Sequence, residues 1–350
     1  MARRITFAIP GDLDAPTGGY GYDRRIVAEL RRLGWRVDVL ALGEGFPRPS
    51  LAQAAVAAGR LAAAPADGPI VVDGLAFGVL PGSATALRES HRLVALVHHP
   101  LALETGLAAA EAERLQQSER MALAAARRVI ATSRMTAATL ASAFGVPADR
   151  IDVVVPGTDR APFATGSDGR RPRLLSVAAV VPRKGFDLLV EALARGTDLP
   201  WHLTIAGDRT RDPAAAAALD AAIVRHRLAG RIDCTGAVSA ERLAALHAGA
   251  DLFVLASHYE GYGMAFAEAI AHGLPVIGTT GGAIPEVVPA TAGRLVPPGD
   301  VAALAAVLRD VLGNGDLRHT LAAGARAAAA ALPSWADSGA RFARVLELLS

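Results

Sequence analysis

The sequence predicts an α/β protein made of two doubly wound domains that face each other across a cleft. Its 350 residues exceed the roughly 100–200 residues of one typical domain, and its 52% apolar composition supplies side chains for two cores. Short β-branched or apolar segments alternate with alanine-rich stretches of helical period, which is typical of a parallel sheet covered by helices on both faces. A turn-rich, charged segment at 156–172 interrupts this alternation, and we expect the domain linker there.

The first domain is expected over residues 1–160. Its predicted strands are Ile5–Ile9, Val37–Ala41, Ile70–Val72, Leu93–Val97, Val129–Thr132 and Ile151–Val155. Its predicted helices are Tyr22–Leu33 and Ala110–Ala126. Ligands of such sheets bind beyond the carboxyl ends of the strands, so we expect the functional residues in the loops that follow the strands.

The second domain is expected over residues 161–332. Its predicted strands are Arg173–Val177, Trp201–Ala206, Ile232–Thr235, Leu252–Ala256 and Val276–Gly278. Its predicted helices are Phe186–Ala194, Ala214–Arg227, Glu241–Ala248 and Met264–Ala271, and alanine-rich 320–331 has the propensity of an ordinary helix. The last segment, 333–350, carries apolar residues from Trp335 to Leu349 on one helical face, which predicts a helix packed against a core.

Composition excludes several classes of function. The net charge of 36 − 34 = +2 argues against a nucleic-acid-binding surface, and the single cysteine, Cys234, excludes an intrachain disulfide or a cysteine-based zinc site. No apolar run is long enough to cross a bilayer, and Pro10 ends the first apolar stretch before a secretory signal could form. We therefore expect a cytoplasmic, soluble protein, or at most one that contacts a membrane peripherally.

The helix expected at Tyr22–Leu33 carries four arginines opposite its apolar residues. Such a face could lie on an anionic membrane, although a solvated face of a core-packing helix is the favoured interpretation.

Three features after strands of the first domain are candidates for binding. Gly18-Gly19, expected in the loop before a helix that begins near Tyr22, would offer backbone N–H groups to an anion, or would form a plain turn. Asp12 and Asp14 have the spacing of a metal-binding pair, but a solvated turn is favoured because nothing nearby supplies further oxygen ligands. His98-His99 follows a strand at its carboxyl end, where an imidazole can bond a hydroxyl or phosphate oxygen or can simply end the strand.

The segment Pro182-Arg-Lys-Gly185 places two cations and a glycine before a predicted helix, which is a natural position for a diphosphate. The alternative is a solvated basic turn. Lys184 is the one lysine among 36 basic residues, which favours a site that requires a compact point charge.

Glu260 and Glu268 frame the start of another predicted helix. Glu260 precedes the helix and Glu268 lies about one turn inside it, so both carboxylates can point into one site, with Gly261 and Gly263 permitting close approach of a ligand. A capping or salt-bridging role for Glu268 is the alternative. A glycine loop at 279–286 follows the next strand and is expected to line the same cleft.

Together these residues resemble family 4 of the retaining, nucleotide-sugar-dependent glycosyltransferases, whose fold, GT-B, consists of two Rossmann-like domains facing a cleft. The resemblance is modest over the first 110 residues and specific from about Ala131 onward. It rests on segments 131–133, 153–159, 182–189 and 203–207, and on the E-x7-E pattern from Glu260 to Glu268 followed by Ala269-Ile-Ala-His-Gly-Leu-Pro-Val-Ile277.

The resemblance implies a role for each candidate residue. The second domain would bind a UDP- or GDP-sugar, with Glu268 on the ribose, Glu260 on the transferred sugar and Lys184 on the diphosphate, while the first domain would hold the acceptor. The remaining contacts to the donor would come from Gly18, Gly19, His98, Gly263 and Met264. It implies no metal ion and no other cofactor, and a final helix that returns to the first domain.

One departure from the family pattern concerns the diphosphate. Where the family commonly has Gly-Arg, this chain has Ala178-Ala179, and Arg183 is the nearest residue that could compensate. The predicted activity is transfer of a hexose with retention of configuration. A nucleotide-sugar epimerase of the same fold and a non-catalytic nucleotide-sugar-binding protein are the alternatives, and the sequence leaves the acceptor and the oligomeric state open.

Overall fold

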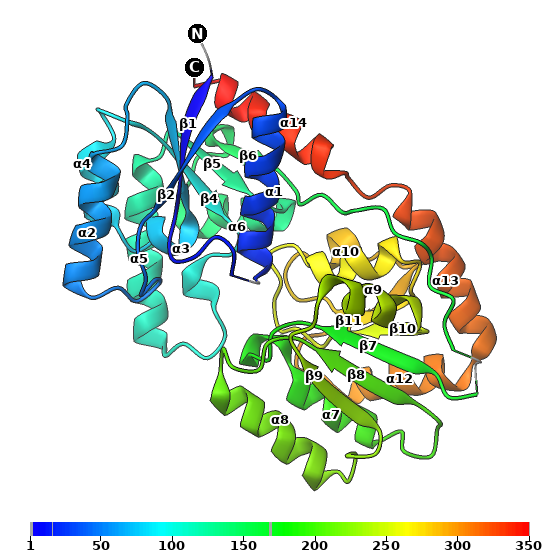
Figure 1. Ribbon diagram of the computed structural model, residues 1–350. Helices are drawn as coiled ribbons and strands as arrows, with labels where there is room; N and C mark the ends of the chain where they lie inside the picture. Colours follow the sequence, from blue (N-terminus) through cyan, green and yellow to red (C-terminus); the bar gives the residue numbers. More distant parts are fainter. Residues whose placement is uncertain (1–2, 16, 168–169, 350) are drawn as a thin grey trace. The chain divides into compact units, whose positions relative to one another are not determined.

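The computed structural model describes residues 3–15, 17–167 and 170–349, and the chain divides into two compact units. Unit 1 contains the residues up to Gly157 together with those from Pro333 onward, and unit 2 contains Thr158–Leu332. Each unit is built around one six-stranded parallel sheet with helices packed against it (Figure 1). The predicted fold class of two doubly wound α/β domains is therefore confirmed.

The sheet of unit 1 has the strand order β2-β1-β3-β4-β5-β6, and every neighbouring pair is parallel. Its strands are β1 (Arg4–Ile9), β2 (Arg36–Ala41), β3 (Pro69–Asp73), β4 (Arg92–Val97), β5 (Arg128–Ala131) and β6 (Ile151–Val153). Its helices are α1 (Gly18–Arg32), α2 (Leu51–Ala62), α3 (Gly74–Phe77), α4 (Pro81–Leu87), η1 (Leu101–Leu103), α5 (Ala109–Ala125), α6 (Arg134–Phe144), η2 (Ala148–Arg150) and α14 (Trp335–Glu347).

The sheet of unit 2 has the order β12-β11-β10-β7-β8-β9 and is also parallel throughout. Its strands are β7 (Arg173–Val177), β8 (His202–Ala206), β9 (Ile232–Gly236), β10 (Leu252–Val254), β11 (Val276–Thr279) and β12 (Gly293–Val296). Its helices are η3 (Pro182–Lys184), α7 (Phe186–Ala194), α8 (Pro213–Arg225), α9 (Ala240–Ala248), α10 (Met264–Ala271), α11 (Ile284–Val287), α12 (Val301–Gly313) and α13 (Gly315–Ala329).

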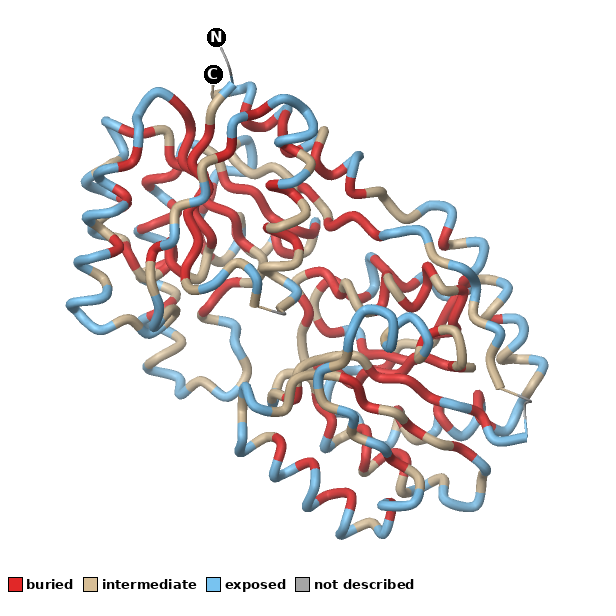
Figure 2. The backbone as a smooth tube through the Cα atoms, viewed as in Figure 1, coloured by how far each residue is buried: buried red, intermediate tan, exposed pale blue. Residues whose placement is uncertain are grey.

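The central strands explain why the sheets fold. Strands such as Pro69–Asp73 and Leu252–Val254 are buried along their whole length, as expected for parallel strands covered on both faces (Figure 2). Outer helices alternate between buried and exposed residues in the same view. In both units, the loops after the strands gather at the carboxyl edge of the sheet, where a site is expected.

The last helix belongs to unit 1. Phe342 of α14 stacks on Phe7 of β1 with ring centroids 6.2 Å apart, and Trp335 meets the edge of Tyr22 in α1 at 6.0 Å. Gly339 lies against α1 so closely that a Cβ there would be 2.4 Å from the Cβ of Glu29. The amphipathic pattern at the end of the sequence thus corresponds to a helix that completes the core of unit 1.

The arginines of α1 contact the chain itself. Arg24 donates to the carbonyl oxygens of Leu13 and Ala15, and Arg25 lies over the Trp335 ring at 5.1 Å. Arg31 donates to the Val37 carbonyl at 3.0 Å, and Arg32 pairs with Glu29 at 2.7 Å. These contacts favour the core-packing interpretation of the helix. Among the described residues, no helix combines the length and hydropathy that a membrane span requires.

The prediction for the start of α1 was wrong. The helix begins at Gly18, four residues before Tyr22, because Thr17 caps it by accepting the N–H of Tyr20 at 3.2 Å. Gly18 and Gly19 are therefore the first residues of the helix and do not lie in a loop before it.

Candidate active site

The loop between β7 and α7 places two cations at the carboxyl edge of unit 2. Its 3-10 turn contains Arg183 and Lys184 and is followed by Gly185. Gly185 has φ +61°, and a Cβ there would lie 2.2 Å from the carbonyl oxygen of Ala256, so the close approach of the loop to the end of β10 requires glycine.

Both cations contact the carboxylate of Glu260. Lys184 Nζ lies 2.6 Å from Glu260 Oε1, and Arg183 Nη1 lies 3.3 Å from Oε2 while donating to the Tyr259 carbonyl at 2.7 Å. The Ser257 hydroxyl donates to Oε1 at 2.6 Å. Burial would raise the pKa of Glu260, but the charges of Lys184 and Arg183 and these hydrogen bonds outweigh burial and hold that pKa below its ordinary value. Glu260 is therefore a buried, ionised carboxylate.

The third glycine loop positions Glu260 through the backbone. Ala283 N–H donates to the Glu260 carbonyl at 2.9 Å, and Gly282 pairs with Glu260 as an isolated parallel bridge. Gly282 has φ +67°, and a Cβ there would lie 2.2 Å from the same carbonyl oxygen. The loops after β7, β10 and β11 thus form one connected group at the carboxyl edge of the sheet.

Glu268 lies one turn inside α10 and has a different environment. Burial first, and the charge of Asp159 second, raise its pKa to about 7. Helix α10 begins at Met264, after Gly263 in a left-handed conformation with φ +102°. The structure therefore places Glu260, Gly263, Met264 and Glu268 in succession at one loop–helix junction.

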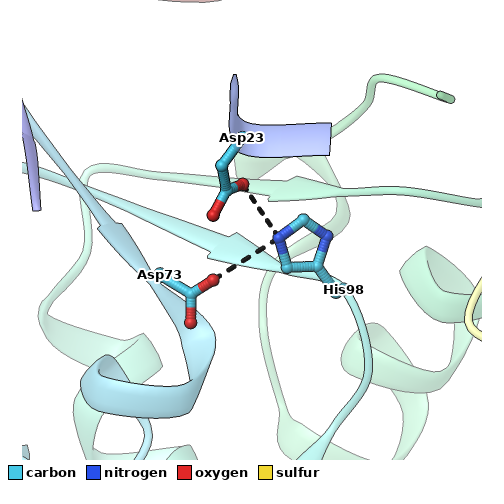
Figure 3. A group of neighbouring side chains, drawn as sticks. All are labelled: Asp23, Asp73 and His98. Atoms are coloured by element: carbon cyan, nitrogen blue, oxygen red, sulfur yellow. Dashed lines mark hydrogen bonds and ion pairs between the residues drawn. The ribbon is translucent and has the colours of Figure 1, made fainter. Parts of the chain in front are cut away.

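In unit 1, His98 follows β4 and contacts two buried aspartates. Its Nε2 lies 3.0 Å from Asp23 Oδ1 and 3.5 Å from Asp73 Oδ2 (Figure 3). Asp23 comes from α1 and Asp73 ends β3. A Cβ on Gly19 would lie 3.5 Å from His98 Cδ2, so the first turn of α1 packs against the imidazole ring. His99 lies 3.8 Å from Glu104.

One oxygen each of Asp23 and Asp73 and one ring nitrogen of His98 lie within 4.8 Å of one another, and two carboxylates with an imidazole are residue types that can hold a metal ion. His98 Nε2 hydrogen-bonds Asp23 Oδ1, whereas Asp73 Oδ2 at 3.5 Å lies within ion-pair distance of the same nitrogen, so the three side chains form one charged group. Asp12 and Asp14 are exposed, and Asp12 Oδ1 accepts the N–H of Asp14 at 2.9 Å, which is the solvated turn that we favoured.

The two aspartates were not predicted. Asp73 directly follows the apolar run Ile70–Val72, so its position at the end of a strand could have identified it as a candidate site residue. Asp23 lies among the apolar residues of α1, and its burial becomes evident only when the partner elements are known.

The loop after His98 has its own anchor. Glu119 of α5 accepts the N–H groups of Leu101 and Ala102 at 2.7 and 3.0 Å. Burial raises the pKa of Glu119 to about 7 even though both hydrogen bonds lower it. This buried carboxyl fixes the backbone that carries His98 and His99.

Comparison with known proteins identifies the class. The model described as "Glycosyltransferase Family 4" matches residues 22–161, and the model described as "Glycosyl transferases group 1" matches residues 158–328. The chain therefore belongs to the group 1, family 4 glycosyltransferases, and it is a glycosyltransferase.

The curated relatives are mannosyl- and glycosyltransferases. The chain is 30% identical over 323 residues to the MMP α-(1→4)-mannosyltransferase of Mycolicibacterium hassiacum, covering 87% of this chain and 76% of that protein. It is 32% identical over 241 residues to the GDP-mannose-dependent α-(1-6)-phosphatidylinositol monomannoside mannosyltransferase of Mycolicibacterium smegmatis, covering 62% of this chain and 60% of that protein.

Solved structures share the fold. Sucrose-phosphate synthase from Thermosynechococcus elongatus superposes with a TM-score of 0.81 at 22% identity, covering 98% of both chains. HepE from Anabaena in complex with UDP-glucose superposes with a TM-score of 0.79 at 20% identity, covering 99% of both chains. These likenesses identify the fold as GT-B, as the sequence predicted.

Proposed function

We propose that this protein transfers a hexose from a UDP- or GDP-sugar to an acceptor hydroxyl, with retention of configuration and without a metal ion. Unit 2 binds the donor, and unit 1 supplies residues for the acceptor. The observation that carries the proposal is the group formed by Lys184, Arg183 and Glu260, in which two cations and one ionised carboxylate converge at the carboxyl edge of a parallel sheet.

Each residue of this group has a defined task. Lys184 and Arg183 contact the diphosphate, Glu260 accepts hydrogen bonds from hydroxyls of the transferred sugar, and Glu268 accepts them from the ribose. Gly263 and Met264 add the N-terminus of α10 to the donor site. In unit 1, Gly18 and Gly19 at the N-terminus of α1 offer backbone N–H groups to a phosphate.

The chemistry requires stabilisation of the leaving group. Cleavage of the bond between sugar C1 and the β-phosphate oxygen leaves negative charge on the diphosphate, which cations and helix N-termini stabilise. The acceptor oxygen bonds to C1 on the face that the phosphate leaves, and the acceptor proton passes to the departing phosphate oxygen. No carboxylate of the chain then acts as a nucleophile.

The relatives support a nucleotide-sugar donor but differ in its base. The Mycolicibacterium smegmatis relative is GDP-mannose-dependent, and HepE binds UDP-glucose. The same relative acts on a phosphatidylinositol monomannoside, which is compatible with a cytoplasmic enzyme that contacts a membrane only at its periphery.

Binding measurements on two matched variants test the assignment of the glutamates. Glu268→Gln should weaken binding of free nucleoside diphosphate and of nucleotide sugar alike, whereas Glu260→Gln should spare the free nucleotide. Equal loss of free-nucleotide affinity in both variants, measured by isothermal titration calorimetry, would contradict the role of Glu260.

Product analysis tests the reaction itself. Incubation with radiolabelled UDP- and GDP-sugars and an acceptor panel should give an α-linked product that EDTA does not diminish. Donor conversion without any acceptor would indicate an epimerase, for which the relatives give no support. Donor binding without transfer would indicate a non-catalytic binding protein.

A further inference from the structure

The cluster of Asp23, Asp73 and His98 in unit 1 has a structure that the proposed function does not explain. Three separate elements contribute to it: α1, the end of β3 and the residue after β4. Both carboxylates face the same imidazole nitrogen, Nε2, at 3.0 and 3.5 Å (Figure 3). The second oxygen of Asp73, Oδ1, accepts the N–H of Leu75 at 2.7 Å, which fixes that carboxylate toward the ring.

Both aspartates are almost completely buried, with 0% of Asp23 and 1% of Asp73 exposed. A buried carboxylate is costly unless a cation or several hydrogen-bond donors accompany it. Among the described residues, no further charged group acts on Asp23 or His98. The Tyr22 ring meets His98 edge-on at 5.2 Å, and its hydroxyl donates to the Val154 carbonyl at 2.9 Å. Burial also keeps the pKa of Tyr22 well above its ordinary value, so this side chain is neutral. The protonated imidazole is the cation that offsets the charge of this pair, and it lowers the pKa of Asp23, which burial nevertheless raises to about 7.

The other ring nitrogen of His98, Nδ1, remains available. It points away from both carboxylates in Figure 3, and among the described residues it has no hydrogen-bond partner and is not buried. A neutral imidazole with its proton on Nε2 would present a basic lone pair at Nδ1. An imidazolium presents an N–H donor there.

We infer that Asp23 and Asp73 are positioning residues that hold His98 as an imidazolium, so that Nδ1–H serves as a fixed cationic hydrogen-bond donor to an oxygen of the bound substrate. This inference rests on the proposed function. In this arrangement His98 does not remove the proton of the acceptor hydroxyl, and Nε2 is kept from rotating toward the substrate by two carboxylates at once. Burial by itself would lower the pKa of His98, but the two aspartates outweigh burial and raise it to about 10.

The first experiment needs no variant of the cluster. Long-range ¹H–¹⁵N spectra of the imidazole groups in the full chain, with His98 assigned by its absence in His98→Gln, should show both ring nitrogens of His98 protonated from pH 6 to pH 9. Titration of His98 near pH 6.5 would overturn the inference. Because this readout does not depend on activity, it decides the inference even if the chain transfers no sugar.

Variants then identify the carboxylates as the cause. Asp23→Asn and Asp73→Asn should each lower the pKa of His98 by at least about one unit, whereas Asp12→Asn, which removes an exposed carboxylate of the same unit, should leave it unchanged. The alkaline limit of kcat/KM should move by the same amount as the His98 pKa in each variant. A loss of activity at all pH values without such a shift would indicate a purely structural role and would contradict the inference.

The same samples exclude or reveal a metal site. We expect no stoichiometric divalent metal in the purified protein and no change of the His98 resonances with EDTA or added Zn²⁺ or Mn²⁺. Metal that is bound by the wild type and lost in His98→Gln would overturn the assignment of the cluster as a hydrogen-bonded ion group.

Discussion

Burial and neighbouring charges together set the ionisation of the two glutamates of the candidate site. Glu260 and Glu268 lie eight residues apart at one loop–helix junction, yet the pKa of Glu260 is lowered and that of Glu268 is raised to about 7. The two pKa values differ because the surroundings differ. Glu260 contacts two cations, whereas Glu268 is buried without a neighbouring cation among the described residues and lies near the negative charge of Asp159. Sequence spacing predicted the position of both residues but gave no information on their charge.

The raised pKa of Glu268 predicts a pH-dependent affinity for nucleotide. The carboxylate that accepts ribose hydroxyls forms as the pH rises through about 7, so binding of a nucleoside diphosphate should tighten between pH 6 and pH 8. Titration of the phosphate contributes to the same trend. Glu268→Gln is therefore the control: calorimetry should show a flatter pH dependence of the dissociation constant in this variant, and an identical dependence would contradict the assignment.

Arg183 is predicted to compensate for the arginine absent at Ala179. Its guanidinium is held by Glu260 and by the Tyr259 carbonyl, and 21% of the side chain is exposed, so it is not a solvent-directed charge. Loss of one preorganised donor to a developing oxyanion costs about 2.7–4 kcal/mol, so Arg183→Ala should lower kcat roughly 10²–10³-fold.

Steady-state kinetics give the matched comparison for this prediction. Arg211→Ala removes an exposed arginine of unit 2 and should leave kcat within a few-fold of the wild type. Adding Ala179→Arg to Arg183→Ala should restore part of the lost rate. An Arg183→Ala enzyme as active as the control would leave Lys184 and the helix N-termini as the support of the diphosphate.

At the level of elements, periodicity with large apolar residues predicted several helices and strands, although helix α12 and strand β12 were missed. The helices Phe186–Ala194 and Met264–Ala271 and the strand Arg173–Val177 occur with the predicted ends. Helix α2 (Leu51–Ala62) was not predicted because it is rich in alanine and buries only Ala57 and Leu61, so its sequence has little apolar contrast. Helix α1 begins early because the cap at Thr17 outweighs the low helix propensity of Gly18 and Gly19.

Two glycine-to-alanine substitutions should have opposite effects, because Gly339 lies in the contact between α1 and α14 whereas Gly59 of α2 has open space around it. Gly339→Ala would place a Cβ 2.4 Å from the Cβ of Glu29 and should lower the free energy of unfolding by about 1–3 kcal/mol. Gly59→Ala, in the exposed middle of α2 where nothing lies within 4 Å, should raise it by about 0.5–1 kcal/mol. Urea denaturation measures both, and a neutral Gly339→Ala would show that the helix pair relaxes.

A stacked histidine pair in unit 2 predicts a loss of stability in acid. His247 and His272 stack with centroids 4.5 Å apart, and burial first and His272 second lower the pKa of His247 to about 4. Between pH 6.5 and pH 4, His247 of the unfolded chain binds a proton that folded His247 does not bind. The free energy of unfolding therefore decreases as the pH is lowered, and at pH 4 it should be about 3 kcal/mol smaller than at neutral pH.

Replacement of the ring tests this pH dependence. His247→Gln should flatten the stability profile of unit 2 between pH 6.5 and pH 4, whereas His319→Gln, which changes an exposed histidine of α13, should not. Hydrogen exchange of peptides from α9 and α10 reports the change locally. Equal acid sensitivity of the wild type and His247→Gln would exclude the histidine pair as its cause.

For the whole molecule, the alternation of strands and helices was enough to predict two parallel sheets. It could not predict which distant side chains meet. Lys184 and Glu260 are 76 residues apart and pair because β7 and β10 are neighbours in the sheet order, and Asp23 meets His98 because α1 packs beside the end of β4. Such pairs depend on strand order, which the local pattern of the sequence does not contain.

The division into two units predicts that a nucleotide stabilises one of them selectively. At about 100 times its dissociation constant, a ligand adds roughly 2.7 kcal/mol to the stability of the part that binds it. Hydrogen exchange with saturating UDP or GDP should therefore slow in β7, β10 and α10 of unit 2 and remain unchanged in β2 and α2 of unit 1. Equal protection in both units would contradict donor binding by unit 2.

Unit 2 is inserted in the sequence of unit 1, because the segment Thr158–Leu332 separates Gly157 from the residues that form α14. A ribosome therefore releases the whole of unit 2 before it releases Phe342 and Trp335, which pack on β1 and α1. During synthesis, the apolar surface of β1 and α1 that α14 covers therefore stays exposed until after all residues of unit 2 have been synthesised. Completion of unit 1 therefore requires residues that are synthesised after all those of unit 2, although most of unit 1 is synthesised first.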